Sequence, residues 1–338
     1  MRTIAIDAMG GDLAPDEVVK GVATASLQTD IQCVLVGDER RIQEILERVE
    51  YNPEQIDIHP AGEVIGMAEE PKDAVRHKRD ASILVAARLV ADGGADALVS
   101  AGNTGAAVLA CARHFQVIPG IRKTALASVY PRQTEYPGQD HLALLLDVGA
   151  TIRCDAIELV QFALMGGAYA KRVSKVASPR VALLNMGTEP TKGSAELVEA
   201  HRALQALSGV NFIGNIEGND LVKGKADVIV TEGLVGNVAL KLLEGLAEVM
   251  VDMAGAAAEE SWRWRLGMRM LAGGVDRLRE LADYTTYGGA PILGFQNLFI
   301  KAHGRSPARA ITNAVKVAAK AARDGVPEEI ALGIAGLR

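Results

Sequence analysis

Short apolar runs alternate with longer Ala- and Leu-rich stretches along most of the chain. The runs have the length and the Val and Ile content of buried strands, and the stretches have the length of helices. We predict strands at Thr3–Asp7, Gln32–Val36, Ile56–His59, Ala97–Ser100, Ala125–Val129, Ala143–Asp147, Val181–Leu184, Asn211–Ile213 and Val228–Thr231. We predict helices at Glu17–Ser26, Glu39–Val49 (with Asp38 as its N-cap), Ala81–Asp92, Gly105–Arg113, Ala156–Lys171, Ala195–Leu207 and Ala239–Met253. This alternation indicates crossover units, and so an α/β fold with a mostly parallel sheet.

No Pro- or Ser-rich linker interrupts the pattern, so we expect residues 1–338 to form a single unit of two closely joined lobes. Residues 255–283 are the exception to the pattern. They are expected to form a helical segment, and they contain Trp262, Arg263, Trp264, Arg265 and Arg269. Apolar side chains would fall on two sides of this helix, unlike the single stripe of an ordinary surface helix. We expect it to project and contact a second subunit, a membrane surface or an acidic partner; an ordinary helix in a dimer interface explains the pattern equally well.

Composition narrows the class of protein. The chain is 49% apolar, which excludes a disordered chain. Its 36 Lys and Arg against 42 Asp and Glu give a net charge of −6, which argues against nucleic-acid binding. The three cysteines are far apart, which predicts neither a disulfide nor a zinc site. Asp7 puts a charged residue where a signal peptide would need its apolar run. No uncharged apolar stretch is long enough for a membrane span. We therefore predict a cytoplasmic protein with at most peripheral membrane contact.

Glycine is the unusual residue, because the chain has 35 glycines but only 4% aromatic residues. Several predicted strands end in Gly-rich loops, at residues 7–12, 100–105, 147–151, 185–193 and 231–237. Ligands of parallel sheets bind beyond the carboxyl ends of the strands, and Gly beside Ser, Thr or Asn exposes backbone N–H groups there. Glycine is also the ordinary turn residue, but the recurrence of these loops favours a site for phosphate or another oxyanion.

Missing motifs exclude other chemistries. The first strand is not followed by GxGxxG, and the chain has no GxxxxGK[ST], so neither a dinucleotide fingerprint nor a P-loop is present. The chain has neither a GxSxG elbow nor an HExxH motif, which argues against a serine hydrolase or a zincin. We therefore predict an anion-binding α/β enzyme without an obvious covalent nucleophile.

Several motifs resemble the PlsX family of phosphate acyltransferases. They are residues 7–12 with Pro15, residues 100–106, residues 227–237, residues 287–291, and His303 with Gly304. The resemblance runs in order from residue 4 to about residue 315. It implies a three-layer α/β/α fold like that of isocitrate and isopropylmalate dehydrogenases. It also implies a homodimer that converts acyl-(acyl-carrier-protein) and inorganic phosphate into acyl phosphate for phospholipid synthesis. Thr151, Glu232 and Ala81 depart conservatively from the family pattern, and we assign them no catalytic role.

Within this scheme we predict three catalytic residues. Lys192 would neutralise phosphate or the oxyanion, Asn237 would donate to the oxyanion or cap a helix, and His303 would orient phosphate, relay a proton or be structural. Further residues are predicted to form the phosphate side of the site or to order its first loop: Asp7, Gly10, Gly11, Asp12, Gly102, Asn103, Thr104, Gly105, Gly187 and Gly236. The arginines at 263, 265 and 269 would dock the acidic carrier protein or anionic lipid. We predict no metal and no cofactor.

Other functions remain open from the sequence. The nearest is a phosphotransacetylase that uses acyl-coenzyme A, which has the same chemistry with a different thiol. A metal-dependent hydroxyacid dehydrogenase is a more distant alternative on the same fold. A non-enzymatic, membrane-associated scaffold for lipid synthesis is a further alternative, motivated by the Trp and Arg residues of the 255–283 segment.

Overall fold

The computed structural model describes residues 1–134, 141–270 and 288–337. Its strands are β1 (Arg2–Asp7), β2 (Ile31–Gly37), β3 (Ile56–Pro60), β4 (Ala97–Ser100), β5 (Ala125–Pro131), β6 (Leu142–Leu146), β7 (Arg180–Leu184), β8 (Asn211–Ile216), β9 (Val228–Val230), β10 (Ala290–Leu293) and β11 (Leu298–Lys301). Its α-helices are α1 (Asp16–Gln28), α2 (Glu39–Leu46), α3 (Pro71–His77), α4 (Ser82–Ala91), α5 (Thr104–His114), α6 (Ala156–Arg172), α7 (Ala195–Ala206), α8 (Gly233–Glu260), α9 (Trp262–Met270), α11 (Ala308–Arg323) and α12 (Val326–Ala335). Two short 3-10 helices span Pro53–Gln55 and Gly218–Lys223.

The strands form one 11-stranded sheet in the order β3-β2-β1-β4-β11-β10-β5-β6-β9-β7-β8. Neighbours pair in parallel within β3-β2-β1-β4-β11 and within β6-β9-β7-β8. The pairs between β11, β10, β5 and β6 are antiparallel. The predicted mostly parallel sheet is therefore confirmed. It consists of two parallel halves that run in opposite directions, joined through β10 and β5.

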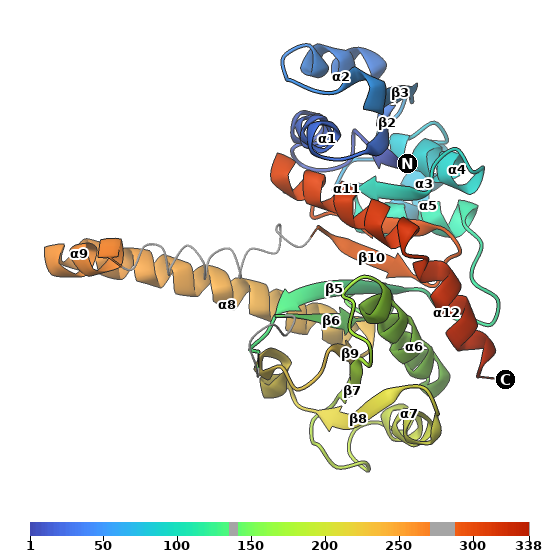
Figure 1. Cartoon of the computed structure of the whole chain (residues 1–338), viewed down its shortest axis with the longest axis vertical. Coiled ribbons are helices and arrows are strands. Elements are labelled where there is room, and N and C mark those ends of the chain that lie inside the picture. The colour runs from blue at the N-terminus through green and yellow to red at the C-terminus, as the bar shows by residue number, and fades with distance from the viewer. Residues whose placement is uncertain (135–140, 271–287, 338) are drawn as a thin grey trace.

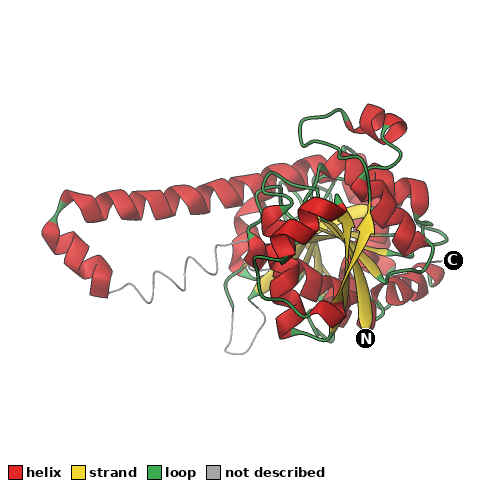
Figure 2. Ribbon diagram, turned by 90° about the horizontal axis from the view of Figure 1, so that it is seen from above, coloured by secondary structure: helices red, strands yellow, loops and turns green. Residues whose placement is uncertain are grey.

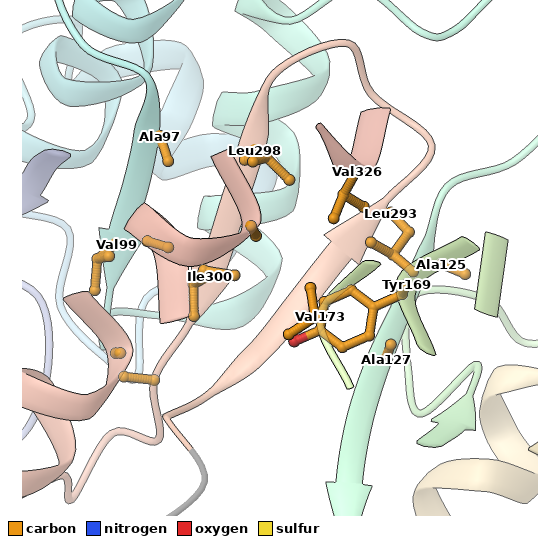
Figure 3. Packing of buried hydrophobic residues seen from close by; sticks show 14 of the residues in the cluster. Ala97, Val99, Ala125, Ala127, Tyr169, Val173, Leu293, Leu298, Ile300 and Val326 are labelled. Atoms are coloured by element: carbon orange, nitrogen blue, oxygen red, sulfur yellow. The ribbon is translucent and has the colours of Figure 1, made fainter. Parts of the chain in front are cut away.

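Helices cover both faces of the sheet, which makes the three layers that were predicted (Figure 1). One buried cluster joins the sheet to α1, α2, α6, α7, α11 and α12, and the other joins it to α3, α4, α5 and the start of α8. Figure 3 shows the first cluster at the junction of the two halves, where side chains of β4, β11, β10 and β5 meet Tyr169, Val173 and Val326. The core is thus continuous across the junction.

Local chemistry explains where elements begin and why two strands escaped the sequence pattern. Asp38 caps α2 as predicted, because its side chain accepts a hydrogen bond from the N–H of Arg41 at 3.2 Å. The strands β10 and β11 were not predicted. Each has only four residues, and Pro291 argues against a central strand because it lacks an N–H. The ladder to β5 accommodates Pro291 by beginning one residue later, at Ile292.

The helix α8 is longer than predicted and leaves the body of the molecule. It begins at Gly233 rather than at Ala239, packs on the sheet with its first turns, and then projects into solvent with α9 at its end (Figure 2). Extended backbone at Ser261 separates α8 from α9, so the helical segment expected over residues 255–283 is interrupted at that residue. Residues 271–283 of the predicted segment lie outside the described residues. No helix within the described ranges is long and apolar enough to cross a membrane.

Candidate active site

A cleft of about 450 Å³ lies where the two halves of the sheet meet. The loops that follow β1, β4 and β11 line it from one half, and the loop after β6 and the first turns of α8 line it from the other. Four of the predicted site residues, Asp12, Thr104, Asn237 and His303, face this cleft. The other lining residues are Met67, Leu126, Ser128, Val129, Val148, Gly149, Leu240, Lys241, Glu244, Gly289, Ala290, Lys301, Ala302 and Gly304. The Gly-rich strand ends therefore contribute to one shared site.

Asp7 lies beneath the cleft and holds the first loop in place. Its carboxylate accepts hydrogen bonds of 2.6 Å from the hydroxyls of Ser82 and Ser100. Burial raises the pKa of Asp7, although these hydrogen bonds act to lower it. A Cβ on Gly10 would lie 2.2 Å from the Asp7 carboxylate, so glycine here permits close packing against that group, and its predicted place on the phosphate side stays a prediction.

The first loop is also tied to the loop after β11. The N–H of Asp12 donates to the carbonyl of Gly304 at 2.8 Å. Gly11 has a φ of +122°, and a Cβ there would lie 3.2 Å from the same carbonyl. The two loops therefore lie against each other at the rim of the cleft, and glycine permits that approach.

The loop after β4 presents the first turn of α5 to the cleft. Asn103 caps this helix, because its side-chain oxygen accepts from the N–H of Ala106 at 3.1 Å. Its amide donates to the carbonyls of Met67 and Glu69, both at 3.0 Å. The side chain of Asn103 is thus occupied in positioning the loop, while the next residue, Thr104, lines the cleft. Two neighbouring glycines allow tight packing: Gly102 lies against Asp7 and Ser100, and Gly105 lies against Pro71.

On the opposite side, Asp147 organises the loop after β6. Its carboxylate accepts from the backbone N–H groups of residues 126, 149, 150 and 151 at 2.7–3.1 Å. The first turn of α8 packs on this loop, since a Cβ on Gly236 would lie 1.9 Å from the carbonyl oxygen of Asp147. Asn237 then reaches the cleft, and its amide donates to the carbonyl of Val148 at 3.0 Å. Asn237 is not the helix N-cap, because α8 begins four residues earlier.

The structure does not bring Lys192 or Gly187 to this cleft. Lys192 is exposed in the loop after β7, where its carbonyl accepts from the amide of Asn185 at 2.9 Å. That loop borders a second, mainly apolar cavity of about 610 Å³ on the other side of α8. The catalytic role of Lys192 stays a prediction, and within one chain it is not supported by proximity to the other predicted residues.

Sequence reasoning missed Lys301, which lines the cleft and is only 7% exposed. Burial lowers the pKa of Lys301 to about 8, with the charges of Asp7 and Asp12 acting in the opposite direction. The available signal was a lysine at the end of an apolar run, two residues before His303. That signal was overlooked because β11 itself was not predicted.

His303 lines the cleft beside Lys301 and Lys241 and remains partly exposed to solvent. Burial and the positive charge of Lys241 lower the pKa of His303. The neutral ring therefore predominates near pH 7. The N–H of Arg305 donates to Nδ1 at 3.3 Å, which places the ring proton of the neutral form on Nε2. His303 is thus a neutral hydrogen-bonding group in the cleft.

The residues predicted for a docking segment lie far from the cleft along α8. Trp262, Arg263, Trp264, Arg265 and Arg269 all belong to α9, at the end of the projecting helix (Figure 2). Among them Arg263, Trp264 and Arg265 are exposed. No three His, Cys, Asp or Glu side chains gather as a metal-binding group in the described part of the chain.

Solved structures identify the fold as one shared by acyl-transferring enzymes. A phosphotransacetylase from Streptococcus pyogenes superposes with a TM-score of 0.65 at 17% identity, covering 96% of this chain and 94% of that one. A 4-hydroxythreonine-4-phosphate dehydrogenase from Klebsiella pneumoniae superposes with a TM-score of 0.53 at 15% identity, covering 94% and 98%. The molecule therefore has the α/β architecture that phosphotransacetylases and certain dehydrogenases share. The predicted fold is confirmed.

Sequence comparison narrows this class to one family. The family model described as "Fatty acid synthesis protein" matches residues 2–329. The phosphate acyltransferase of Dictyoglomus turgidum is 42% identical over 332 residues, which cover 98% of this chain and 97% of that protein. The chain belongs to the phosphate acyltransferase (PlsX) family, and it is an acyltransferase.

Proposed function

We propose that this acyltransferase moves a fatty acyl group from acyl-(acyl-carrier-protein) to inorganic phosphate and releases acyl phosphate for phospholipid synthesis. The observation that carries the proposal is the cleft itself, where Gly-rich loops from both halves of the sheet meet Thr104, Asn237 and His303. Family membership supports phosphate as the acceptor, because the relatives in that family are phosphate acyltransferases.

The reaction needs no covalent enzyme nucleophile. A phosphate oxygen forms a bond to the thioester carbonyl carbon, and the carbon–sulfur bond then breaks as the tetrahedral intermediate collapses. A substantial fraction of inorganic phosphate is dianionic near neutral pH, so its oxygens are nucleophilic without a strong base. The leaving thiol has a pKa of about 8.5, so it departs as a thiolate and takes a proton from water. The protein must align the reactants and stabilise the oxyanion.

The cleft residues suit these tasks. The N-terminus of α5, with Thr104 and Gly105, offers backbone N–H groups to phosphate. The side-chain amide of Asn237 has two N–H donors, and one of them donates to the carbonyl of Val148. The second N–H is assigned to the oxyanion. The neutral His303 donates from Nε2 to a phosphate oxygen. Asp7, Asp12, Asn103 and the glycines at 10, 11, 102 and 236 position these groups, as their contacts above describe.

The projecting α8 and α9 supply the surfaces for the proposed partners. The exposed tip residues Trp264, Leu266 and Met270 are apolar, and Arg263 and Arg265 lie among them. That combination fits an interfacial helix that binds an anionic membrane peripherally. Along α8, exposed apolar side chains fit a second copy of the chain and thus a homodimer. The acidic carrier protein would meet the arginines of α9 before or after membrane contact.

The test is an assay that offers long-chain acyl-(acyl-carrier-protein) and acyl-coenzyme A separately, with phosphate omitted and then restored. Hydroxylamine traps acyl phosphate as the hydroxamate, and a thiol reagent measures the released carrier. We expect both signals from the carrier-protein substrate only when phosphate is present, with sulfate as the control anion. A clear preference for coenzyme A would indicate a phosphotransacetylase instead. Acyl transfer that ignores phosphate would overturn the proposal, and activity without membranes would exclude a purely structural scaffold.

A further inference from the structure

Three neighbouring strands end side by side beneath the cleft. Asp7 of β1 lies opposite Ser100 of β4, and Ser100 lies opposite Lys301 of β11. Each is the last residue of its strand, so the three form a polar row at the carboxyl edge of this half of the sheet. The row places a cation directly under the loops that carry Thr104 and His303.

The ammonium of Lys301 has three N–H donors, and the structure shows one of them in a hydrogen bond. It donates to the carbonyl of its neighbour Ala302, and it forms no ion pair with any described residue. The Asp7 carboxylate is already held by Ser82 and Ser100. A buried ammonium that uses one of its three donors is costly to the folded protein. An anion in the cleft would supply the missing partners.

We propose that Lys301 is a catalytic residue that binds the acceptor phosphate through its ammonium group. The inference rests on the proposed function and names the principal cation of that site. The other cation in the cleft, Lys241, is exposed and pairs with Glu244 at 2.6 Å, so its charge is already balanced. His303 is held neutral by its surroundings. Among these three, Lys301 alone is a buried cation that forms no ion pair with a described residue, and it lies at the base of the cleft.

The proposal predicts a particular pH dependence. The charged groups that face Lys301 are Asp7 and Asp12 from the first loop, Lys241 and Glu244 from α8, and His303 beside it. A lysine is charged below its pKa, which burial lowers to about 8. Phosphate binding is therefore complete below that pH and weakens as the pH rises through about 8. Protonation of the phosphate dianion limits activity on the acid side.

The experiment compares Lys301→Met and Lys301→Arg with the parent enzyme and with Lys20→Met, an exposed lysine of α1 that does not line the cleft. Loss of a charge-assisted contact should raise the KM for phosphate about 10- to 100-fold in Lys301→Met. The KM for the acyl donor should change little. The decline of kcat/KM above about pH 8 should disappear in that variant and move to higher pH in Lys301→Arg, whose side chain stays charged.

Folding is checked separately, because removing a buried charge should leave the Tm equal or higher. Lys20→Met should keep the parent KM and pH profile. An unchanged phosphate KM together with an unchanged alkaline limb in Lys301→Met would overturn the role of Lys301 while leaving the proposed function standing. If the parent enzyme itself shows no phosphate-dependent transfer, the proposed function fails first.

Discussion

At the scale of single residues, contact with backbone atoms fixes several glycines of the cleft. Gly236 is the tightest case, because a Cβ there would lie 1.9 Å from the carbonyl oxygen of Asp147 and 2.9 Å from Thr231. The contact with Asp147 is with backbone and cannot be relieved by rotating a side chain. The first turn of α8, which carries Asn237, can therefore pack on the loop after β6 only with glycine at this position.

We expect Gly236→Ala to displace this turn, since the backbone must move to admit the methyl group. Overpacking of this kind costs about 1–3 kcal/mol of stability, and misplacing Asn237 should lower kcat by about 10-fold or more. Thermal unfolding and the phosphate-dependent assay measure the two effects. Gly167→Ala on α6 is the matched control, because nothing lies within 4 Å of its Cβ position. That change should stabilise the helix by about 0.5–1 kcal/mol. Equal stability of the two variants would contradict the packing argument.

The same scale shows how much of the site the sequence could reveal. The Gly-rich strand ends pointed to Asp12, Thr104 and Asn237, and the family resemblance pointed to His303. All four line one cleft, and their roles stay predictions. The motifs could not show that the amide of Asn103 donates to the carbonyls of Met67 and Glu69, because these hydrogen bonds join segments that are distant in the sequence. Lys301 follows an apolar run and has no glycine next to it, so the pattern of Gly-rich strand ends did not point to it.

At the scale of elements, the strands of regular βα units were predictable to within a few residues. The strands β10 and β11, at the junction of the two half-sheets, were not predictable. The apolar run Ala97–Ser100 matches β4 to the residue. The strands β10 and β11 are short and lack a helix between them, so the alternation that identified the others is absent. The same gap hid Lys301, because its importance depends on the register of β11 against β4.

The helix α9 leads to a prediction about membranes. Trp264 and Leu266 are 54% and 51% exposed at the tip of the projection, with Arg263 and Arg265 beside them. We expect Trp264→Ser combined with Leu266→Ser to weaken binding to anionic vesicles, because burial of apolar area drives interfacial binding. Vesicle co-sedimentation measures this loss, and activity on soluble acyl-carrier substrate should change less.

A matched control is available on the body of the molecule. Leu332 of α12 is 70% exposed, so Leu332→Ser removes a comparable apolar surface away from the projection. We expect it to bind vesicles as the parent does. Equal binding by all three proteins would assign the apolar tip to protein contact instead of lipid.

At the scale of the whole molecule, the cleft lies between the two half-sheets, and a long exposed apolar surface lies on the projecting helix α8. The halves run in opposite directions, yet loops from both line the same cleft, so the site depends on the antiparallel junction through β10 and β5. The sequence predicted the alternation within each half from local periodicity. Opposite strand directions arise from pairings between distant segments, which periodicity does not encode.

The projection also leaves a long apolar surface uncovered. Val238, Leu242, Leu246, Val249 and Met253 are each 52–69% exposed and follow one another at intervals of three or four residues along α8. This spacing places them on one face, which we call the α8 stripe. Its first residues also line the apolar cavity beside α7. A stripe of this kind on a single helix is typical of a surface that packs against another helix.

We expect a second copy of the chain to cover the α8 stripe, so Leu242→Asp combined with Val249→Asp should shift a dimer to monomer. Each aspartate would bury a charge without a partner in such an interface, which costs several kcal/mol. Sedimentation velocity over a range of protein concentrations measures the change. Leu27→Asp, at an exposed position of α1, is the control that should leave the dimer intact. A parent protein that sediments as a monomer, or a double variant that remains dimeric, would contradict this assignment. The α8 stripe would then have to bind a partner other than a second copy of the chain. Retained activity in the monomer would further show that each cleft is complete within one chain.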